Sequence, residues 1–493
     1  MIYSPISNSL HLRFTVAILS MLLSTLAFYT DDIINSDAIL YVYTIEAFTN
    51  GGLVEMTKLY NWPFFSIIAS LFSQFTHISA ELSAKIICAG LFVLFTDALL
   101  QLSQKILPSS RHLVIAAVLI LSFYTINNYR EFIIRDAGYW AFCCIALFQF
   151  LCFLDTHKIK HAMLWQVAIL VAILFRVEGA VLLAFIPLFV LFDSQSNKIK
   201  SLISLYFLTL TVLFIGIILA ISNDSFSNAF GKISQITNYL NVESLLSDFT
   251  RRADLISNQI MHSAAADYGP MVLFWGLVSI TIYSLIKGIS TPYLLLSLLA
   301  FKYNHKFIKP HYFAFLSYVV LVNVILLIIV TLKINLVTAR YGVLTVTILL
   351  LILLPTFCQF IEDIWHRRNK IQLSIVALLL IFSIGDIFIS SNSKEHVKDV
   401  TKWAAYELPK NVRVMTTDTT VKYYFNINNP KATLTFERDI NLYTNYDYMI
   451  LLQKKKNKAL SSQLQDMSIK SIYEKSGKRD KSIVYQIIRP SDS

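Results

Sequence analysis

The sequence is poor in charge. Asp, Glu, Lys and Arg together make up 15% of its 493 residues, whereas 56% of the residues are hydrophobic. Soluble globular chains carry about 25% charged residues. The composition therefore excludes an ordinary soluble protein and indicates a membrane protein.

Glycine and cysteine are also scarce. The 13 glycines are few for a transporter built on broken helices. All five cysteines lie within apolar runs, so the sequence predicts no disulfide framework and no zinc site. They are Cys88, Cys143, Cys144, Cys152 and Cys358.

What the sequence does contain is a series of apolar runs of roughly 15 to 22 residues, a length that can cross a bilayer. They are Leu12–Tyr29, Leu82–Leu102, Leu113–Ile126, Ala137–Leu154, Ala162–Phe175, Gly179–Phe192, Leu202–Ile221, Pro270–Ile286, Tyr312–Leu332, Tyr341–Ile361 and Ile371–Ile389. Residues 390–493 instead mix polar residues with alternating β-branched and aromatic ones. We predict a polytopic α-helical membrane domain over 1–389, with about 11–13 transmembrane helices, and a soluble α/β domain over 390–493.

Lysine and arginine gather in alternate loops, which predicts the orientation. If the N-terminus is cytoplasmic, the basic loops face the cytoplasm and the acidic first loop, 30–81, faces outside. The large loop at 222–269 and the C-terminal domain then lie outside as well. The apolar stretch at 60–75 would invert every later loop if it crossed, so we interpret it as a re-entrant or interfacial helix. The cytoplasmic set is Lys105, Arg111, Lys158, Lys160, Lys198, Lys200, Lys302, Lys306, Lys309, Arg367, Arg368 and Lys370.

The net charge of +11 comes mostly from the inner loops and the C-terminal region. This distribution suits anionic lipid surfaces better than nucleic acid. The expected partners therefore include membrane lipids and exclude nucleic acid.

Ionisable residues cluster at the predicted outer ends of the spans. They are Asp37, Arg130, Glu131, Arg135, Asp136, Arg176, Glu178 and Arg340. A charge near the membrane is costly unless it is solvated or paired. The one-sided placement therefore predicts an outer-face polar site that several helices share.

Such a set of residues allows one type of chemistry in particular. Arginine binds phosphate through two parallel hydrogen bonds, and a carboxylate can take the proton of a hydroxyl as general base. Together they suit transfer of a sugar from a lipid phosphate. A single carboxylate acting as base implies inversion at the anomeric carbon.

Short motifs follow one another along the chain in a recognisable order. They are "DAILY" (37–41), "YNWP" (60–63), "RDAGYW" (135–140), "RVEG" (176–179) and "RY" (340–341), followed by a C-terminal outer domain. This order resembles the GT-C superfamily of polyprenyl-phosphate-sugar glycosyltransferases, which includes protein O-mannosyltransferases and lipid A aminoarabinose transferases. The resemblance covers nearly the whole chain, and its specificity lies in the order of the motifs.

The resemblance implies that Asp37 is the catalytic base and that Arg340 and Arg176 hold the lipid phosphate. The further substrate-binding residues that we predict are Glu178, Tyr41, Arg135, Asp136 and Tyr341. Some members carry two adjacent acids in the first loop, whereas Asp37 is followed by Ala38. The sequence therefore supports neither a divalent metal nor another cofactor.

Simpler interpretations stay open for the same residues. Asp37 could be a solvated acid or a helix N-cap, and Arg176 with Glu178 could be an ion pair that closes a hairpin. Arg340 could reach the lipid headgroups, and interface anchoring is the favoured role for Arg130. The acids Asp31 and Asp32 are interpreted as interfacial.

The resulting hypothesis is an inverting membrane glycosyltransferase. It would transfer a sugar from a polyprenyl-monophosphate donor to a lipid, glycan or protein acceptor at the periplasmic face of a bacterial inner membrane. The alternatives are a transporter or flippase of lipid-linked sugars, and an oligosaccharide ligase or polymerase. The C-terminal domain shows no nucleophile motif or phosphate loop and is assigned to acceptor recognition or structural capping.

Overall fold

The computed structural model of the chain describes residues 5–30, 33–192, 197–222, 242–303, 309–385, 387, 394–429, 434–454, 463–465, 467–477 and 480–488. Asp31 and Asp32, residues 223–241 of the predicted large loop, and the predicted domain boundary at 389/390 lie outside the described residues.

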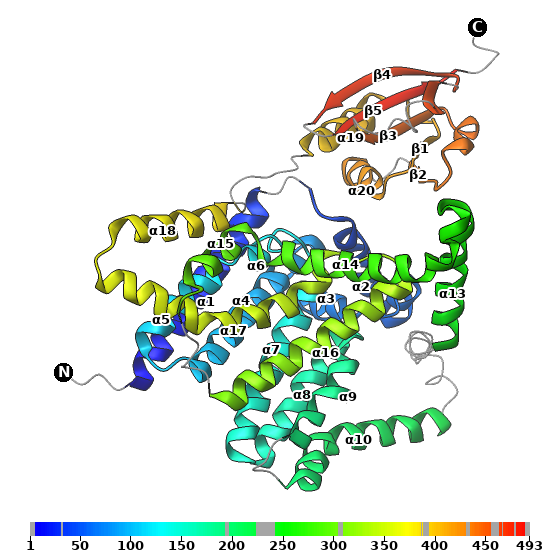
Figure 1. The fold of residues 1–493 in the computed structure, drawn as a ribbon. Coiled ribbons are helices and arrows are strands. Elements are labelled where there is room, and N and C mark those ends of the chain that lie inside the picture. Colours follow the sequence, from blue (N-terminus) through cyan, green and yellow to red (C-terminus); the bar gives the residue numbers. More distant parts are fainter. Residues whose placement is uncertain are drawn as a thin grey trace.

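The first part of the chain is a bundle of helices (Figure 1). Among the described residues, 7 helical stretches are long and apolar enough to cross a membrane, and shorter apolar helices lie between them. The predicted polytopic helical fold is thus confirmed. The helices are α1 (Pro5–Thr30), α2 (Ser36–Leu59), α3 (Phe64–Thr76), α4 (Ala80–Ile106), α5 (Ser110–Leu121), α6 (Tyr124–Asn127), α7 (Asp136–Thr156), α8 (Ile159–Phe175), α9 (Gly179–Phe185), α10 (Lys198–Ser222), α13 (Val242–Leu255), α14 (Gly269–Ile289), α15 (Thr291–Ala300), α16 (Pro310–Ile334), α17 (Ala339–His366) and α18 (Lys370–Gly385).

Several predicted runs are interrupted. The run Leu113–Ile126 divides into α5 and α6, and Gly179–Phe192 changes from α9 to the 3₁₀ helix η1 (Ile186–Phe192). Pro187 has no backbone N–H to continue an α-helix. In the stretch at 60–75 the helix begins only after Pro63, and the resulting α3 has 13 residues. At a rise of about 1.5 Å per residue it spans roughly 20 Å, too short to cross a bilayer core of about 30 Å.

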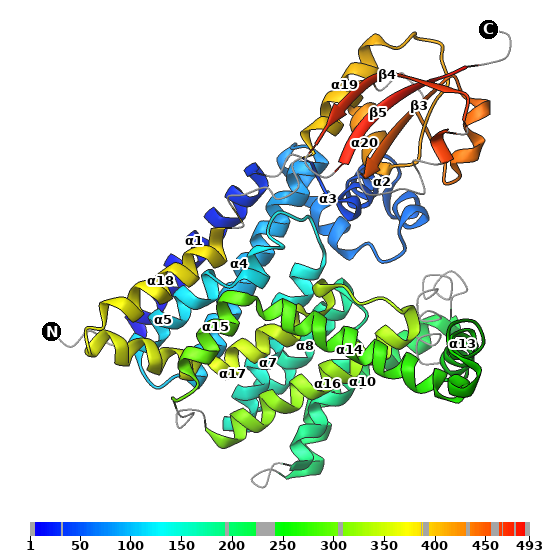
Figure 2. The ribbon, with the colours of Figure 1, turned by 45° about the horizontal axis from the view of Figure 1, so that its top comes forward.

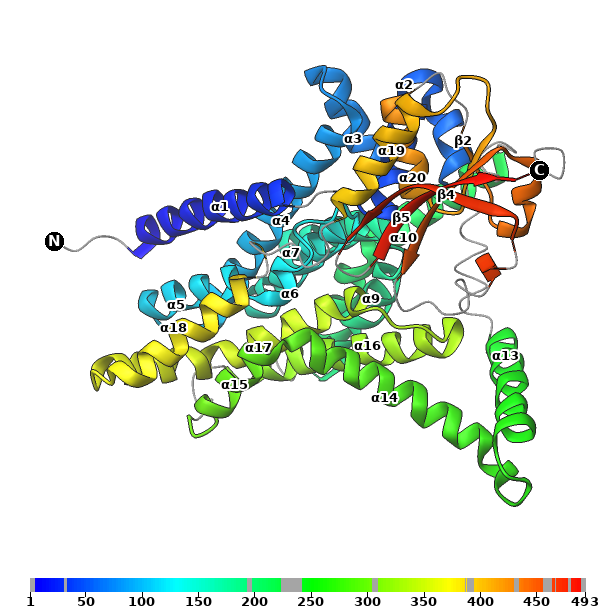
Figure 3. The same ribbon diagram turned by 90° about the horizontal axis from the view of Figure 1, so that it is seen from above.

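Helices α7 and α17 form the centre of the bundle. Their most apolar stretches are 78% and 72% buried, compared with 11% for that of α10. Aromatic rings fix the neighbours of α7. Phe150 stacks on Phe315 of α16 with ring centroids 4.8 Å apart and meets Trp165 of α8 edge-on at 5.2 Å. In contrast, α13 lies at the end of α14 that is remote from α1 (Figure 3).

In the described part of the C-terminal domain, a five-stranded mixed sheet is combined with helices. Its elements are α19 (Glu395–Glu407), β1 (Val414–Thr416), α20 (Thr419–Asn428), β2 (Leu434–Phe436), the 3₁₀ helix η5 (Ile440–Asn445), β3 (Tyr448–Lys454), β4 (Ile469–Ser476) and β5 (Asp480–Ile487). The strand order is β2-β1-β3-β5-β4. Strand β1 is parallel to β2 and β3, and β5 is antiparallel to β3 and β4.

Alternating side chains of this sheet enter two cores. Val414, Ile450 and Val484 pack with Val400 of α19 and Val421 of α20. The intervening Met415, Met449 and Leu451 pack with Ile440 of η5 on the other face. This alternation is what the sequence pattern predicts for an α/β domain, and the predicted C-terminal fold class is confirmed.

Strand β4 and helix α20 are elements that the alternating sequence pattern does not predict. The ladder between β4 and β5 shifts register between Ser471 and Tyr473, and a bulge of this kind breaks the period of two that marks a strand. Helix α20 contains "TTVKYYF", whose β-branched and aromatic residues favour strands. Tertiary packing therefore outweighs local propensity here.

The C-terminal domain lies against the membrane domain through α20. Figure 2 shows α20 beside α2, near the start of α4. The rings of Tyr423 and Tyr43 meet edge-on with centroids 5.8 Å apart. The Tyr423 hydroxyl donates to Glu81 Oε2 at 2.9 Å. The contacts of α20 with the membrane domain are thus made with helices α2 and α4.

Close packing of α7 on α8 depends on Gly138. A Cβ at this position would lie 2.5 Å from ring atoms of Phe175. That ring is buried between Phe64 and Phe142, with centroids 5.0 and 5.9 Å away. We expect Gly138→Ala to unfold at a lower temperature than the wild type, because overpacking a core costs about 1–3 kcal/mol.

The matched control is Gly90→Ala in α4, where an added Cβ meets nothing within 4 Å. It should be neutral or stabilising, since alanine is favoured over glycine within a helix by about 1 kcal/mol. The midpoint temperatures of thermal unfolding are measured for the wild type and both variants, each purified in detergent. Equal midpoints would contradict the assigned packing.

Candidate active site

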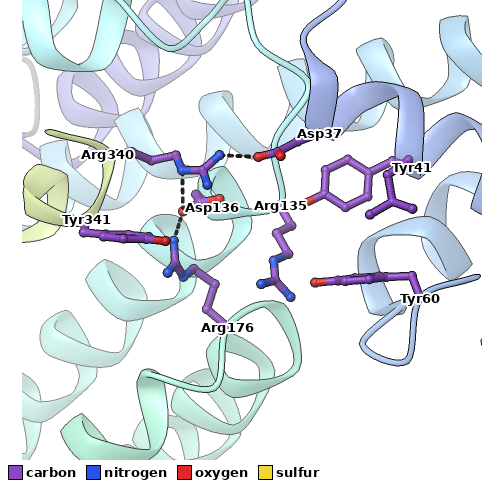
Figure 4. Close-up of a pocket in the computed structure, with 9 residues that line it drawn as sticks. Asp37, Tyr41, Tyr60, Arg135, Asp136, Arg176, Arg340 and Tyr341 are labelled. Carbon is purple, nitrogen blue, oxygen red and sulfur yellow. Dashed lines mark hydrogen bonds and ion pairs between the residues drawn. The ribbon is translucent and has the colours of Figure 1, made fainter. Parts of the chain in front are cut away.

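Side chains from four separate parts of the chain surround a cavity of about 150 Å³. They come from α2 and the turn after it, the start of α7, the turn between α8 and α9, and the start of α17 (Figure 4). The lining residues are Asp37, Leu40, Tyr41, Tyr60, Arg135, Asp136, Arg176, Arg340 and Tyr341. Every site residue predicted from the sequence lines this cavity except Glu178, which lines an adjoining cavity of about 30 Å³.

Asp37 lies in the first turn of α2 and is not its N-cap. The N-cap is Asn35, whose side chain bonds across to another segment rather than to the helix. Its Oδ1 accepts the N–H of Ile133 at 3.0 Å, and its Nδ2 donates to the Ile133 carbonyl at 3.3 Å. The N-cap interpretation of Asp37 is therefore wrong. In the first turn, the unpaired N–H groups of the helix stabilise a negative charge.

Arg340 joins two of the acids. Its Nη1 donates to Asp37 Oδ2 at 2.5 Å, and its Nε lies 3.7 Å from Asp136 Oδ1. The Asp37 side chain is 43% exposed, so one end of this pair faces solvent. Since the guanidinium of Arg340 points into the cavity (Figure 4), the headgroup-anchor interpretation of this residue is wrong.

Asp136 is the most buried acid of the site, with 1% of its surface exposed. It pairs with Arg176 as well as with Arg340, and Figure 4 shows its carboxylate between the two guanidinium groups. Arg176 also forms two hydrogen bonds with Glu178, one of them from Nε to Oε2 at 3.2 Å. The predicted hairpin ion pair is thus present, and its arginine lines the cavity too.

These contacts keep Arg176 and Glu178 charged. Burial alone would raise the pKa of Glu178, but the charge and hydrogen bonds of Arg176 outweigh burial and lower the pKa to about 2. Burial would likewise lower the pKa of Arg176, but Asp136 and Glu178 raise it well above the ordinary value. Neither group changes its protonation near neutral pH.

Arg135 differs from the other two arginines of the site. In the part of the chain that the structure describes, it forms no ion pair with a carboxylate. Its guanidinium lies 5.4 Å from the ring centre of Tyr60, in a cation–π arrangement. Arg135 is therefore the cation best placed to receive an anionic ligand.

Tyrosines complete the wall. Tyr341 lies beneath Arg176, with the guanidinium carbon 4.7 Å from the ring centre. Burial raises the pKa of Tyr41 and of Tyr60 above the ordinary value, so both hydroxyls are neutral donors. Tyr60 is absent from the site residues predicted individually, although the motif "YNWP" contains it.

Arg130 is not part of the site. It is 0% exposed and donates to Asn127 Oδ1 at 2.9 Å, to the Ser20 carbonyl at 3.0 Å and to Ser24 Oγ at 2.8 Å. The interface-anchor interpretation is therefore wrong, because Arg130 ties α1 to the segment before α7. The sequence could not show that two serines of an apolar helix bind its guanidinium.

Arginines and tyrosines supply most of the polar groups that line the cavity. Its carboxylates are paired with arginines, and its remaining polar groups are tyrosine hydroxyls and guanidinium groups. Divalent hard cations prefer several free oxygen ligands. Among the described residues, no group of three or more His, Cys, Asp or Glu could hold a metal ion.

Comparison with known proteins gives remote structural likeness. No protein-family model and no curated protein sequence matches the chain. The chain is similar to the apo structure of ArnT from Cupriavidus metallidurans, with 12% identity, 98% of each chain covered and a TM-score of 0.40. For ArnT bound to undecaprenyl phosphate, the identity is 12%, the coverage 96% of this chain and 97% of that one, and the TM-score 0.42.

A third similar structure is the archaeal oligosaccharyltransferase AglB from Archaeoglobus fulgidus, in complex with an inhibitory peptide and a dolichol-phosphate. The identity is 11%, the coverage 96% of this chain and 74% of that one, and the TM-score 0.46. These likenesses extend over nearly the whole chain, as the series of sequence motifs does.

The ion pair between Glu178 and Arg176 should support the fold. We expect Glu178→Gln to lower the free energy of unfolding by about 1–3 kcal/mol, because a charge-assisted hydrogen bond to a buried arginine is lost. The loss should be constant between pH 6 and 8. The carboxyl, with a pKa of about 2 in the fold and about 4.3 in an unfolded chain, is ionised in both states there.

Denaturant unfolding of wild type and variant at several pH values measures this loss. A depressed pKa contributes stability that is present above the unfolded value and lost as the pH falls toward the folded one. The difference between the proteins should therefore shrink only below about pH 4.3. A difference that varied between pH 6 and 8 would show that Glu178 is not held as an ion.

Proposed function

We propose that the protein is an integral membrane glycosyltransferase that moves a sugar from a polyprenyl-monophosphate donor to an acceptor hydroxyl, with inversion at the anomeric carbon. One observation carries the proposal. The carboxylate of Asp37 and the guanidinium groups of Arg135, Arg176 and Arg340 border one cavity, although they come from distant parts of the chain. The order of the GT-C-like motifs supports the same reaction.

The arginines would hold the donor phosphate. Guanidinium groups bind phosphate through charge-assisted hydrogen bonds and stay charged at any relevant pH. Arg135 can accept the phosphate without giving up a carboxylate. Arg340 would exchange part of its contact with Asp37 for the phosphate, and Arg176 stays anchored by Asp136 and Glu178.

Asp37 would be the general base. As the acceptor oxygen attacks the anomeric carbon, its proton passes to the Asp37 carboxylate. The bond between that carbon and the phosphate oxygen breaks with its electron pair on the phosphate, and polyprenyl phosphate leaves. The arginines stabilise the charge that develops on the leaving phosphate. Attack from the side opposite the phosphate gives inversion.

The cavity and the C-terminal domain lie at the same end of the membrane domain, since α20 contacts the residues just before α2. With the basic loops in the cytoplasm, that end is the outer face of a bacterial inner membrane. The acceptor would then be a lipid, glycan or protein on the periplasmic side. The C-terminal domain is suitably placed to meet it there.

The base assignment is tested with Asp37→Asn. Membranes that contain either protein are offered a panel of radiolabelled polyprenyl-phosphate sugars. We expect the variant to lose about 10²–10⁴-fold in turnover while it still binds the donor, because the arginines are unchanged. Pyrophosphate-linked donors in the same panel distinguish a ligase or polymerase.

The control is Glu55→Gln on the same helix, which should be as active as the wild type because Glu55 is exposed and pairs with Lys58 on the helix surface. Full activity of Asp37→Asn would place the base elsewhere. Movement of intact donor across the membrane by the wild type, without sugar transfer, would indicate a flippase.

The phosphate assignment is tested with Arg135→Gln. Loss of a charged hydrogen bond costs about 1.5–3 kcal/mol, so donor affinity should fall roughly 10- to 150-fold. The exposed Arg413→Gln is the control. Binding of polyprenyl phosphate to the purified proteins measures the effect, and unchanged affinity in Arg135→Gln would exclude this arginine from the phosphate site.

A further inference from the structure

One hydrogen bond connects the C-terminal domain with the backbone that leads to Asp37. The Tyr424 hydroxyl of α20 accepts the N–H of Ile34 at 2.9 Å. Both residues are buried, so water cannot take over this bond. A buried N–H without an acceptor is costly. The bond therefore fixes the chain three residues before Asp37 to α20.

Asn35, the next residue, links this segment to the segment that carries Arg135. Asn35 forms two hydrogen bonds with the backbone of Ile133, which precedes Arg135 by two residues. Cys88 Sγ lies 3.3 Å from the Phe132 carbonyl and holds the same segment from α4. The backbones that present Asp37 and Arg135 are thus joined directly before each side chain.

Tyr423 provides a second contact of α20. Its hydroxyl donates to Glu81 in the first turn of α4, which lies away from the cavity lining. Tyr423 and Tyr424 are neighbours on one helix, both are buried, and both use their hydroxyl in a contact with the membrane domain. The Tyr424 hydroxyl bonds to the backbone just before Asp37, whereas Tyr423 meets α2 through its ring, on Tyr43.

We infer that Tyr424 is a positioning residue for the transfer reaction, through which the C-terminal domain sets the place of the Asp37 carboxylate. The inference rests on the proposed function and deepens it. The docked domain contributes to the geometry of the base, beyond recognising an acceptor or covering the site. A displaced base slows proton transfer. Asp136 still pairs with Arg176 and Arg340, and Cys88 still holds the segment before Arg135 from α4, so the arginines continue to bind the donor.

The experiment compares Tyr424→Phe with Tyr423→Phe in the full-length protein. Each variant removes one hydroxyl and keeps the ring, so each loses one hydrogen bond between the domains. For Tyr424→Phe we expect kcat to fall roughly tenfold, since small displacements of catalytic groups have large effects on rate. The donor KM should stay within about twofold. Tyr423→Phe should change both constants by less than about twofold.

Hydrogen exchange gives a second reading that does not depend on activity. Deuterium uptake of a peptide that covers residues 33–45 should be faster in Tyr424→Phe than in Tyr423→Phe, because the entry to α2 loses its anchor. Equal uptake and equal kcat in the two variants would overturn the inference and leave Tyr424 a docking contact only.

The two proposals fail in different ways. If the wild type transfers no sugar from any donor of the panel, the proposed function is wrong, and the exchange result still decides whether Tyr424 holds the entry to α2. If Asp37→Asn retains full turnover, the base lies elsewhere and Tyr424 does not position it. If Asp37→Asn is inactive and Tyr424→Phe behaves like Tyr423→Phe, the glycosyltransferase assignment stands and the positioning role is wrong.

Discussion

Burial of the Asp136 carboxylate is the constraint on which the site depends. An ionised carboxylate that is taken out of water must be paired, and Asp136 obtains its partners from the turn after α8 and from the start of α17. These segments are far apart in the sequence, so one buried charge decides how three parts of the bundle meet. Once Arg340 is held in this way, it also pairs with Asp37. This pairing places α2, the fourth segment that lines the cavity.

The same pairing explains how a polar site is stable at the end of an apolar bundle. Breaking a buried pair by removing one partner is strongly destabilising, because it leaves an uncompensated charge. A ligand phosphate can replace a carboxylate as the partner of an arginine without creating such a charge. Arg340 shares its guanidinium between a buried and a partly exposed acid, so it can release the exposed acid while the buried one stays paired. Arg340 therefore both stabilises the bundle through Asp136 and has a contact, with Asp37, that can be exchanged.

The sequence predicted the helical membrane domain, and all but one of the residues predicted for the site line one cavity, because both predictions depend on local signals. Long apolar runs are recognised directly in the sequence. Charged residues at the ends of such runs must be solvated or paired, which restricts where they can lie. Contacts made over long sequence separations were hidden. Asn35 occupies the N-cap position of α2, where an Asn side chain usually bonds to the helix N–H groups, but it bonds to the backbone of Ile133 instead. Arg130 has the sequence context of an interface anchor, yet serines of α1 enclose it. In both cases a tertiary partner outweighs the local preference.

Such a partner also gives the C-terminal domain its significance. A soluble domain attached to a membrane enzyme could be a separate unit, joined only by its linker. Here the Ile34 N–H has its acceptor on Tyr424, and the Tyr43 ring packs on Tyr423. If the domain separated from the membrane domain, both rings would be exposed. The Ile34 N–H would also lose its acceptor just before the helix that carries Asp37. The membrane domain therefore completes its packing around the start of α2 with residues of α20.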